Sequence, residues 1–291
     1  MTQVDASFDR LTQVVANRES RDRNYHEMVT TYYQLVNDLY CAGWGESHHI
    51  VPMAPEQTLA DAHAAAEQQL AEQAGLGPGM TALDVGSGVG GPALAIARHS
   101  GAHVTGIDLS PLRVSCARER AEREGIDDRA SFVEGDAQDM AFPTGSFDVT
   151  YSLQAICHAP DKKRVHAEMF RVLKSAGLSL GYDWLAADNL SASEIERYIE
   201  PICRFHGLSH LSTPGELHAA LTDAGFNAVH VESSQGPGME RAWTYLDDLT
   251  RETQDSEDPL VAFMSQGVQV LCEAARAGAF LIVGWTGRKP A

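Results

Sequence analysis

The chain has 291 residues, and 44% of them are apolar, which is enough for a sizeable core in one large or two small domains. The formal net charge of -18 argues against a nucleic acid or an anionic membrane surface as a partner, whereas a hydrophobic small molecule can still enter an apolar pocket. The five cysteines are scattered without a CxxC pair, so the sequence supports neither a metal site nor a disulfide framework. A polar start and the lack of a long apolar run favour a cytoplasmic protein without a membrane span.

The first 75 residues predict an N-terminal helical cap or arm. Residues up to about 20 are polar with weak helical periodicity, so we expect a loosely held arm there. Residues 25–40 repeat apolar and aromatic side chains at helical spacing, and residues 43–49 predict a bend around one large ring. An alanine-rich helix is expected at residues 57–73. The aromatic stripe fits core packing and a ligand site equally well, and it could reach the site of a neighbouring copy in a homo-oligomer.

Residues 76–185 predict the core of the fold, in which strands alternate with helices. The expected strands cover residues 81–85, 103–108, 130–136, 147–153 and 178–184. Two of the helices between them are expected at residues 111–124 and 161–174. This alternation is typical of a Rossmann-like, doubly wound α/β sheet that binds ligands at the carboxyl ends of its parallel strands.

Residues 186–291 predict further helices and two closing strands of the same sheet, which makes seven strands in all. The helices are expected at residues 193–206, 214–225, 241–253 and 259–277, and the strands at residues 228–232 and 279–285. Helices inserted before a closing, hairpin-like pair of strands leave room for a lid over the sheet.

A glycine-rich turn after the first strand is the central motif. Asp84 stands near the end of this strand, and Gly86, Ser87, Gly88 and Gly90 lead directly into an apolar-periodic helix. Glycines let the backbone turn sharply and approach a ligand, and the helix start offers unpaired N–H groups. Dinucleotide enzymes share this pattern, so the turn alone does not identify the ligand.

Acidic residues at the ends of successive strands indicate a cationic ligand. Asp108 closes the second strand 20 residues after Gly88, the right reach for gripping both hydroxyls of a ribose. Asp136 closes the third strand, beside Ala137 and Gln138. Together with the acid before the glycine turn, these carboxylates would repel the pyrophosphate of NAD and suit a sulfonium and an ammonium. They favour S-adenosylmethionine (SAM), with S-adenosylhomocysteine as product, over a dinucleotide.

These residues resemble the class I SAM-dependent methyltransferases and, within them, the sterol 24-C-methyltransferase group. Residues 33–40, Tyr-Gln-Leu-Val-Asn-Asp-Leu-Tyr, followed by Gly-Trp-Gly, are similar to the aromatic signature of that group, and residues 84–93 are similar to its SAM loop. Ala155 and residues 157–160, Cys-His-Ala-Pro, resemble its fourth-strand motif. Residues 182–184, Tyr-Asp-Trp, resemble the end of its fifth strand.

Several positions depart from the sterol pattern. Cys41 and Gln154 stand where that group usually has Glu, and residues 48–50 read His-His-Ile instead of its Phe-His-Phe. The chain is therefore more similar to bacterial enzymes of secondary metabolism that methylate a prenyl or terpenoid chain, such as those of teleocidin-type pathways. The resemblance implies a SAM-dependent methyltransferase that acts on carbon.

The pattern and the resemblance together give a set of candidate site residues. The expected cofactor residues are Tyr33, Asp84, Gly86, Ser87, Gly88, Gly90, Asp108, Leu109, Asp136, Ala137, Gln138, Leu153, Gln154 and His158. The expected substrate residues are the rings of Tyr25, Tyr40, Trp44, Tyr182 and Trp184. The expected catalytic residues are His158, His49 and Tyr32.

The chemistry expected of these residues follows from an alkene as the methyl acceptor. Its π electrons attack the activated methyl group without prior deprotonation, and the resulting carbocation needs a dry pocket, aromatic faces and a late proton acceptor. His158 is the first candidate for that acceptor because it follows the fourth strand, and His49 or a Tyr hydroxyl comes next. Most of the twelve histidines are expected to be structural. Gln154, an amide that cannot act as a base, is expected to bond the cofactor or orient the substrate.

Two other functions remain open. One is methyl transfer to oxygen or nitrogen of a natural product, which would need a base before transfer. The ending at residues 281–284 and 288–290 resembles O-methyltransferases of antibiotic pathways. The other is a SAM-binding protein that folds a substrate for cyclisation and transfers no methyl group.

Overall fold

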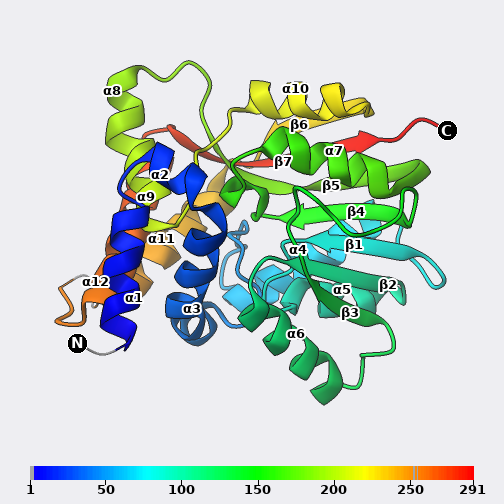
Figure 1. The fold of residues 1–291 in the computed structure, drawn as a ribbon, viewed down its shortest axis with the longest axis horizontal. Helices are drawn as coiled ribbons and strands as arrows, with labels where there is room; N and C mark the ends of the chain where they lie inside the picture. Colours follow the sequence, from blue (N-terminus) through cyan, green and yellow to red (C-terminus); the bar gives the residue numbers. More distant parts are fainter. Residues whose placement is uncertain (1–2, 252, 254) are drawn as a thin grey trace.

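A seven-stranded sheet forms the centre of the computed structural model, which describes residues 3–251, 253 and 255–291 (Figure 1). The strand order is β3-β2-β1-β4-β5-β7-β6; β1 to β5 run parallel, and β7 runs antiparallel to both of its neighbours. The strands are β1 (Thr81–Val85), β2 (His103–Asp108), β3 (Ala130–Glu134), β4 (Phe147–Leu153), β5 (Leu173–Ala186), β6 (Asn227–Ser233) and β7 (Phe280–Arg288). The predicted Rossmann-like α/β fold is confirmed.

The strand order explains where a ligand can bind. β2 and β3 lie on one side of β1, and β4 and β5 lie on the other, so the order reverses between β1 and β4. In open α/β sheets the crevice outside the carboxyl ends of the strands at this switch point takes the ligand. The segments that follow Val85 and Leu153 meet at this edge of the sheet.

Helices cover both faces of the sheet. Adjacent residues of β1 belong to opposite faces, as the pleat requires: Ala82 is in the core cluster that includes residues of α4, α5 and α6, and Leu83 is in the cluster that includes residues of α7 and α10. These helices are α4 (Leu59–Gln73), α5 (Gly91–Ser100), α6 (Pro111–Arg123), α7 (Lys162–Val172) and α10 (Pro214–Ala224).

The N-terminal segment is packed rather than loosely held, so our expectation of a loose arm is wrong. It forms α1 (Gln3–Val14) and α2 (Arg18–Arg23), which precede the long α3 (Tyr25–Trp44). Leu11, Val14 and Val15 are buried in the same core cluster as α3, and α1 lies along α3 in Figure 1. Three well-spaced apolar side chains are enough to anchor an otherwise polar helix.

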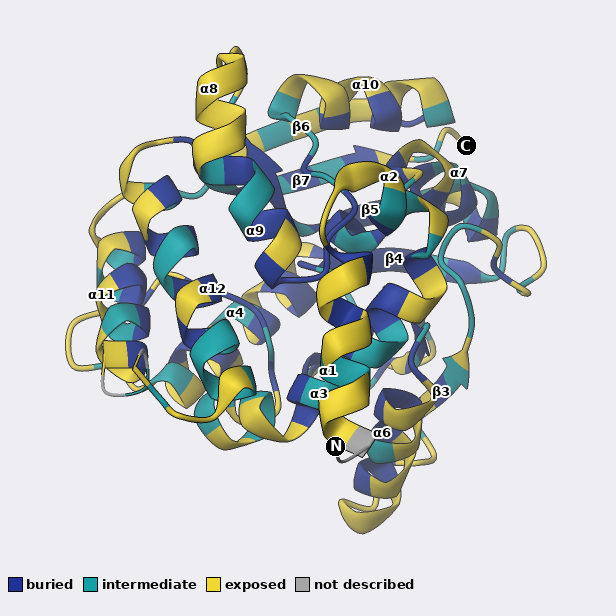
Figure 2. Cartoon of the chain, turned by 60° about the vertical axis from the view of Figure 1, so that its left-hand side comes forward, coloured by how far each residue is buried: buried dark blue, intermediate teal, exposed yellow. Residues whose placement is uncertain are grey.

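The C-terminal helices form a layer beside the end of the sheet (Figure 1). They are α8 (Ala192–Glu194), α9 (Glu200–Phe205), α11 (Pro237–Arg251) and α12 (Pro259–Arg276). The predicted helix 193–206 is interrupted by a π-helical turn (Ile195–Ile199), which accommodates Pro201 because proline lacks an N–H donor. Figure 2 shows the exposed surface of α8. The helix expected at residues 241–253 includes residue 252, which lies outside the described residues. Over the described part of the chain, no helix has the length and apolar character needed to traverse a bilayer.

Candidate active site

A hollow at the carboxyl ends of β1 and β2, hereafter the cofactor hollow, brings many of the predicted residues together. It is lined by Tyr25, Val29, Tyr33, Val85, Gly86, Ile107, Asp108, Leu109, Arg113, Gly135, Ala137, Ala155, Ile156, His158 and Ala159. Six predicted cofactor residues are in this lining: Tyr33, Gly86, Asp108, Leu109, Ala137 and His158. Tyr25, which we expected at the substrate, also lies here. Ser87, Gly90 and Leu153 are buried but are not part of the lining.

The glycine turn has a backbone that side chains would disturb. Gly86 has a φ of +80°, and a Cβ at this position would lie 2.2 Å from the Cβ of Ala155. Asp108 shapes the turn from the neighbouring strand: its Oδ2 accepts the N–H of Gly88 at 2.8 Å, and its Oδ1 accepts the N–H of Ser110 at 2.9 Å. A carboxylate has about four lone-pair sites, so this side chain can still accept the hydroxyls of a ribose.

Asp84 is a buried acid beside the glycine turn, outside the lining of the cofactor hollow. Its side chain is 2% exposed, and its Oδ2 has no hydrogen-bond partner among the described residues. Burial raises the pKa of this carboxyl group to about 8; the nearby hydroxyl of Tyr151 opposes the shift, and the negative charge of Asp108 adds to it. A buried carboxyl group with an unpartnered oxygen at the ligand edge of the sheet suits an ammonium group, which would both pair with it and ionise it.

His158 joins α3 to the segment that follows α9. Its Nδ1 lies 3.0 Å from the carbonyl oxygen of Gly207 and must therefore carry the hydrogen, so its Nε2 accepts the hydroxyl of Tyr33 at 2.9 Å. Burial lowers the pKa of His158 to about 4, which keeps the ring neutral near pH 7. Both ring nitrogens are thus engaged within the protein.

Sequence reasoning missed Arg113, a buried residue of α6. Its guanidinium lies 3.9 Å from the centre of the Tyr33 ring, and its Nη2 donates to Nδ1 of His48 at 3.0 Å. A Cβ at Gly88 would lie 2.3 Å from Nη2, so the guanidinium crosses the glycine turn. Its Nε has no partner in the described part of the chain. This cation at the hollow is therefore available to an anionic group of a ligand.

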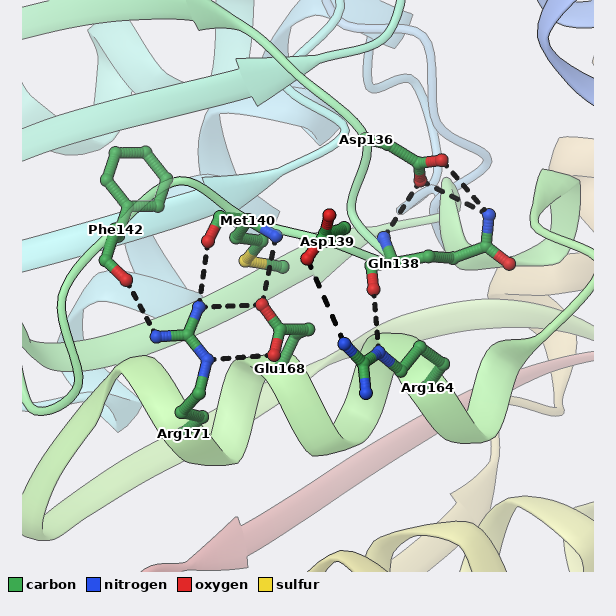
Figure 3. A network of polar contacts seen from close by, with 8 residues as sticks. All are labelled: Asp136, Gln138, Asp139, Met140, Phe142, Arg164, Glu168 and Arg171. Carbon is green, nitrogen blue, oxygen red and sulfur yellow. Dashed lines mark hydrogen bonds and ion pairs between the residues drawn. The ribbon is translucent and has the colours of Figure 1, made fainter.

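The loop between β3 and β4 is fixed to α7, as Figure 3 shows. Asp136 accepts the backbone N–H of Gln138 at 2.8 Å, and the side chain of Gln138 accepts the N–H of Asp161 at 3.0 Å. Arg164 and Arg171 of α7 donate to carbonyl oxygens of this loop. The predicted residues Asp136 and Gln138 thus hold the loop that places Ala137 in the lining of the cofactor hollow.

A second hollow, hereafter the apolar cavity, lies between α3, the end of β5 and the helices α11 and α12. It has a volume of about 160 Å³ and is lined by Leu39, Tyr40, Gly43, Trp44, Trp184, His206, Leu249, Thr250, Thr253, Val261, Met264, Ser265, Val268 and Leu271. Three of the rings predicted for the substrate, Tyr40, Trp44 and Trp184, lie in this lining. The rings of Tyr33 and Tyr40 stand 6.4 Å apart and connect the two hollows. None of the described lining residues is charged.

Tyr182 and Tyr32 lie outside the lining of the apolar cavity. Tyr182 lines a separate hollow with His230 and Glu232, away from both sites. Tyr32 is buried against the cavity wall, where its hydroxyl lies 3.1 Å from that of Tyr40 and donates to the sulfur of Met264.

Gln154 and His49 hold the segment that follows α3. The Oε1 of Gln154 accepts the N–H of Ile50 and the Nε1–H of Trp184, both at 2.8 Å, and its Nε2 donates to the carbonyl of Ile50 at 2.7 Å. We expected this amide to face the cofactor or the substrate, but it ties the segment to β5. His49 is buried 3.4 Å from a carboxylate oxygen of Glu67 and lines a hollow of only about 10 Å³.

Known proteins are similar to this chain in sequence and in fold. A family model described as a methyltransferase domain matches residues 83–180. The sterol 24-C-methyltransferase ERG6A of Gibberella zeae is 40% identical over 74% of this chain and 57% of its own length. The sterol 24-C-methyltransferase ERG6B of the same organism is 37% identical over 86% of this chain and 67% of its own length. The chain thus spans roughly three fifths of the length of such relatives.

Two solved structures are similar across most of the chain. The [4+2]-cyclase SpnF has a TM-score of 0.75 and 25% identity, over 91% of this chain and 96% of its own. The geranyl diphosphate C-methyltransferase of Streptomyces coelicolor A3(2) has a TM-score of 0.70, covers 91% of this chain and 97% of its own, and at 19% identity shows likeness of fold.

The sheet, the glycine turn and the acids at the strand ends define a class I SAM-dependent methyltransferase. Within that class, the identity to ERG6B over two thirds of its length shows that the chain belongs to the sterol 24-C-methyltransferase family.

Proposed function

We propose that this chain transfers the methyl group of SAM to an alkene carbon of a prenyl or terpenoid chain in secondary metabolism. The observation that carries the proposal is the apolar cavity beside the cofactor hollow, with three aromatic rings and no charged side chain in its described lining. Such an apolar lining disfavours water and offers ring faces to a cation, which alkene methylation requires. An alkene needs no base before the methyl transfer, whereas a hydroxyl or amine acceptor would have to lose a proton first.

SAM supplies an activated methyl group, and the protein has to hold it. In this proposal Asp84 pairs with the ammonium group of SAM, Asp108 accepts the ribose hydroxyls, and Arg113 pairs with the carboxylate. The last role follows from charge: the carboxylate is the one anionic group of SAM, and the buried guanidinium crosses the glycine turn. Asp108 is close enough to raise the pKa of Arg113, but the guanidinium forms no ion pair with a carboxylate among the described residues. Positioning of this kind can contribute roughly 7–11 kcal/mol to a transfer reaction.

The aromatic rings stabilise the positive charge that methyl transfer leaves on the acceptor. Tyr40 and Trp44 meet edge to face at 5.5 Å, and Trp184 faces the same cavity from β5. Each well-placed ring contributes roughly 0.5–2 kcal/mol to binding a cation. Several rings are needed, and the cavity contains three.

The chain ending that resembles O-methyltransferases has a structural role. The Nζ of Lys289 donates to the carbonyl oxygens of Phe170 and Leu173, both at 2.7 Å, and thereby fixes the end of β7 to the junction of α7 and β5. This part of the resemblance therefore supports a shared sheet structure and gives no preference for an oxygen acceptor.

Carbon-13-labelled SAM tests the proposal. The protein is incubated with geranyl diphosphate, squalene, a prenylated indole and a sterol with a side-chain alkene, and NMR locates the label. We expect a new carbon-carbon bond on one of the first three. Methylation of the sterol alone would indicate a sterol acceptor, as in the names of its relatives, and would contradict a prenyl or terpenoid acceptor. A label on oxygen or nitrogen would reject the alkene mechanism.

The likeness to SpnF, which is described as a [4+2]-cyclase, supports a second candidate, a SAM-binding protein that folds a substrate for cyclisation. This function predicts that SAM binds and that no S-adenosylhomocysteine is formed over any substrate in the panel. Liquid chromatography of the same reactions measures S-adenosylhomocysteine and separates the two candidates.

A further inference from the structure

The apolar cavity contains a histidine that sequence reasoning did not single out. His206 follows α9 and meets the ring of Trp184 edge to face at 5.1 Å. Its Nε2 lies 3.0 Å from the carbonyl oxygen of Gly267, so Nε2 carries the hydrogen and Nδ1 is an acceptor. Nδ1 is buried and has no hydrogen-bond partner in the described part of the chain.

The other buried polar groups of the cavity wall have partners. The hydroxyls of Tyr40 and Tyr32 lie 3.1 Å apart, and those of Ser265 and Thr253 lie 2.7 Å apart. The Nε1–H of Trp184 donates to Gln154. Among the described lining residues, Nδ1 of His206 is therefore the buried side-chain polar atom that has no partner. An unpartnered acceptor in an apolar wall is costly and calls for a functional explanation.

The histidines favoured by the sequence are less suited to take a proton from the substrate. His158 uses both ring nitrogens within the protein, toward Tyr33 and Gly207. His49 lines a hollow of about 10 Å³, which has room for no more than a water molecule. Gly207, the next residue after His206, packs on the ring of Tyr32, so His206 stands close to the junction of the two hollows.

We propose that Nδ1 of His206 is the proton acceptor that ends the reaction, an inference that rests on the alkene methylation proposed above. The methyl group leaves sulfur as its bond to the alkene carbon forms, and the positive charge moves to the neighbouring carbon. A C–H bond beside that carbon then gives its electrons to a new double bond and its proton to Nδ1. The imidazolium keeps its Nε2–H on Gly267 and releases the extra proton to solvent after the product leaves.

Burial lowers the pKa of His206 to about 4, so the ring is neutral and its lone pair is present near pH 7. Such a weak base is sufficient, because a proton beside a carbocation is far more acidic than an imidazolium. A stronger base in this wall would itself be protonated and would repel the cation.

Two cations that differ by one hydrogen test the inference without knowledge of the substrate. Protonated N,N-dimethyldecylamine has an N–H that can donate to Nδ1, whereas decyltrimethylammonium has the same charge and no such hydrogen. Calorimetry in the presence of S-adenosylhomocysteine measures the affinity of the protein for each cation, at concentrations below the critical micelle concentration. We expect the wild type to prefer the tertiary amine about tenfold or more. His206→Phe, which keeps a ring against Trp184, should abolish the preference.

His166→Phe is the matched control. His166 is also buried, has an unpartnered Nδ1 and meets Trp285 edge to face at 5.3 Å, but it lines a different hollow. This variant should keep the preference. If the wild type binds both cations equally or binds neither, the inference is overturned. This outcome is measured on the wild type alone and does not depend on the folding of a variant. Survival of the preference in His206→Phe would overturn it as well.

The labelled-SAM reaction separates failure of this inference from failure of the proposed function. On an accepted alkene, His206→Phe should lower kcat about 100-fold while the affinity for SAM stays unchanged. Labelled carbon with unchanged kcat in His206→Phe would leave the proposed function standing and reject His206 as the acceptor. A label on a heteroatom would reject both.

Discussion

Asp84 is the residue whose protonation should govern the stability of the SAM-free protein. Its pKa is raised from 3.8 to about 8 by burial, so the unfolded chain loses this proton first as the pH rises. The contribution of Asp84 to stability is therefore lost progressively between about pH 4 and pH 8. We expect Asp84→Asn, which cannot ionise, to unfold at a higher temperature than the wild type at pH 8, with the gain shrinking towards pH 4. Thermal melts across this range measure it, and a difference that does not change with pH would contradict the assignment.

Arg113 gives a second prediction at the residue scale. Arg113→Met should weaken SAM binding about 10- to 100-fold, because a charge-assisted hydrogen bond to the carboxylate is lost. Decarboxylated SAM lacks that carboxylate and serves as the control ligand, whose affinity should hardly change. Titration calorimetry with both ligands measures the two effects. An equal loss for both ligands would show that Arg113 only supports the shape of the hollow.

The cofactor residues that could be predicted from the sequence are those whose type is dictated by the backbone. Gly86 has a left-handed conformation and touches Ala155, and Asp108 caps the glycine turn, so few other residues would fit. Arg113 and His206 could not be predicted in this way. Arg113 lies on a helix rich in arginine, a pattern typical of a solvent-exposed helix, and the packing of α3, His48 and the glycine turn around it buries the guanidinium. The free nitrogen of His206 is defined by the carbonyl of Gly267, which is 61 residues away.

At the scale of elements, the segment after α3 is held to β5 by one side chain, Gln154. Gln154→Ala would leave the buried N–H of Ile50 and the Nε1–H of Trp184 without their acceptor. We expect a loss of about 2–5 kcal/mol in the free energy of unfolding, since each orphaned group costs about 1–3 kcal/mol. Urea denaturation measures this loss. Gln68→Ala, which removes an exposed pair with Glu72, is the control and should change little. Comparable stability of the two variants would refute the role given to Gln154.

Elements with a regular period could be predicted from the sequence, and those decided by a few contacts could not. The strands at residues 81–85, 103–108 and 147–153 have their predicted bounds because each is a short run rich in β-branched, aromatic or other apolar residues. α1 was underestimated because its apolar residues are few, and their burial depends on α3 and α12. The π-helical turn before Pro201 reflects a local conflict between a proline and an otherwise helical pattern.

At the scale of the whole molecule, the N-terminal cap is joined to the C-terminal layer by a buried cation. The side chain of Arg21 is wholly buried: its Nη2 pairs with Glu200 of α9 at 2.8 Å, its Nε donates to the carbonyl of Ser209 at 3.1 Å, and its Nη1 donates to that of Val15 at 3.2 Å. It thus connects the end of α1 to both sides of the segment that contains His206. The cap is therefore part of the wall that supports the apolar cavity.

Arg21→Met should separate these layers. We expect a loss of about 2–4 kcal/mol in the free energy of unfolding, because the carbonyl groups of Val15 and Ser209 lose a buried donor, whereas Glu200 is 41% exposed and stays hydrated. Arg18→Met is the control, since Arg18 is exposed and lies 3.6 Å from Asp22 in a surface pair worth about 1 kcal/mol or less. Urea denaturation measures both, and hydrogen exchange should show faster opening of α1, α2 and α9 in Arg21→Met. If the two variants prove equally stable, the cap does not depend on this connection, and the cavity wall must be held by apolar packing alone.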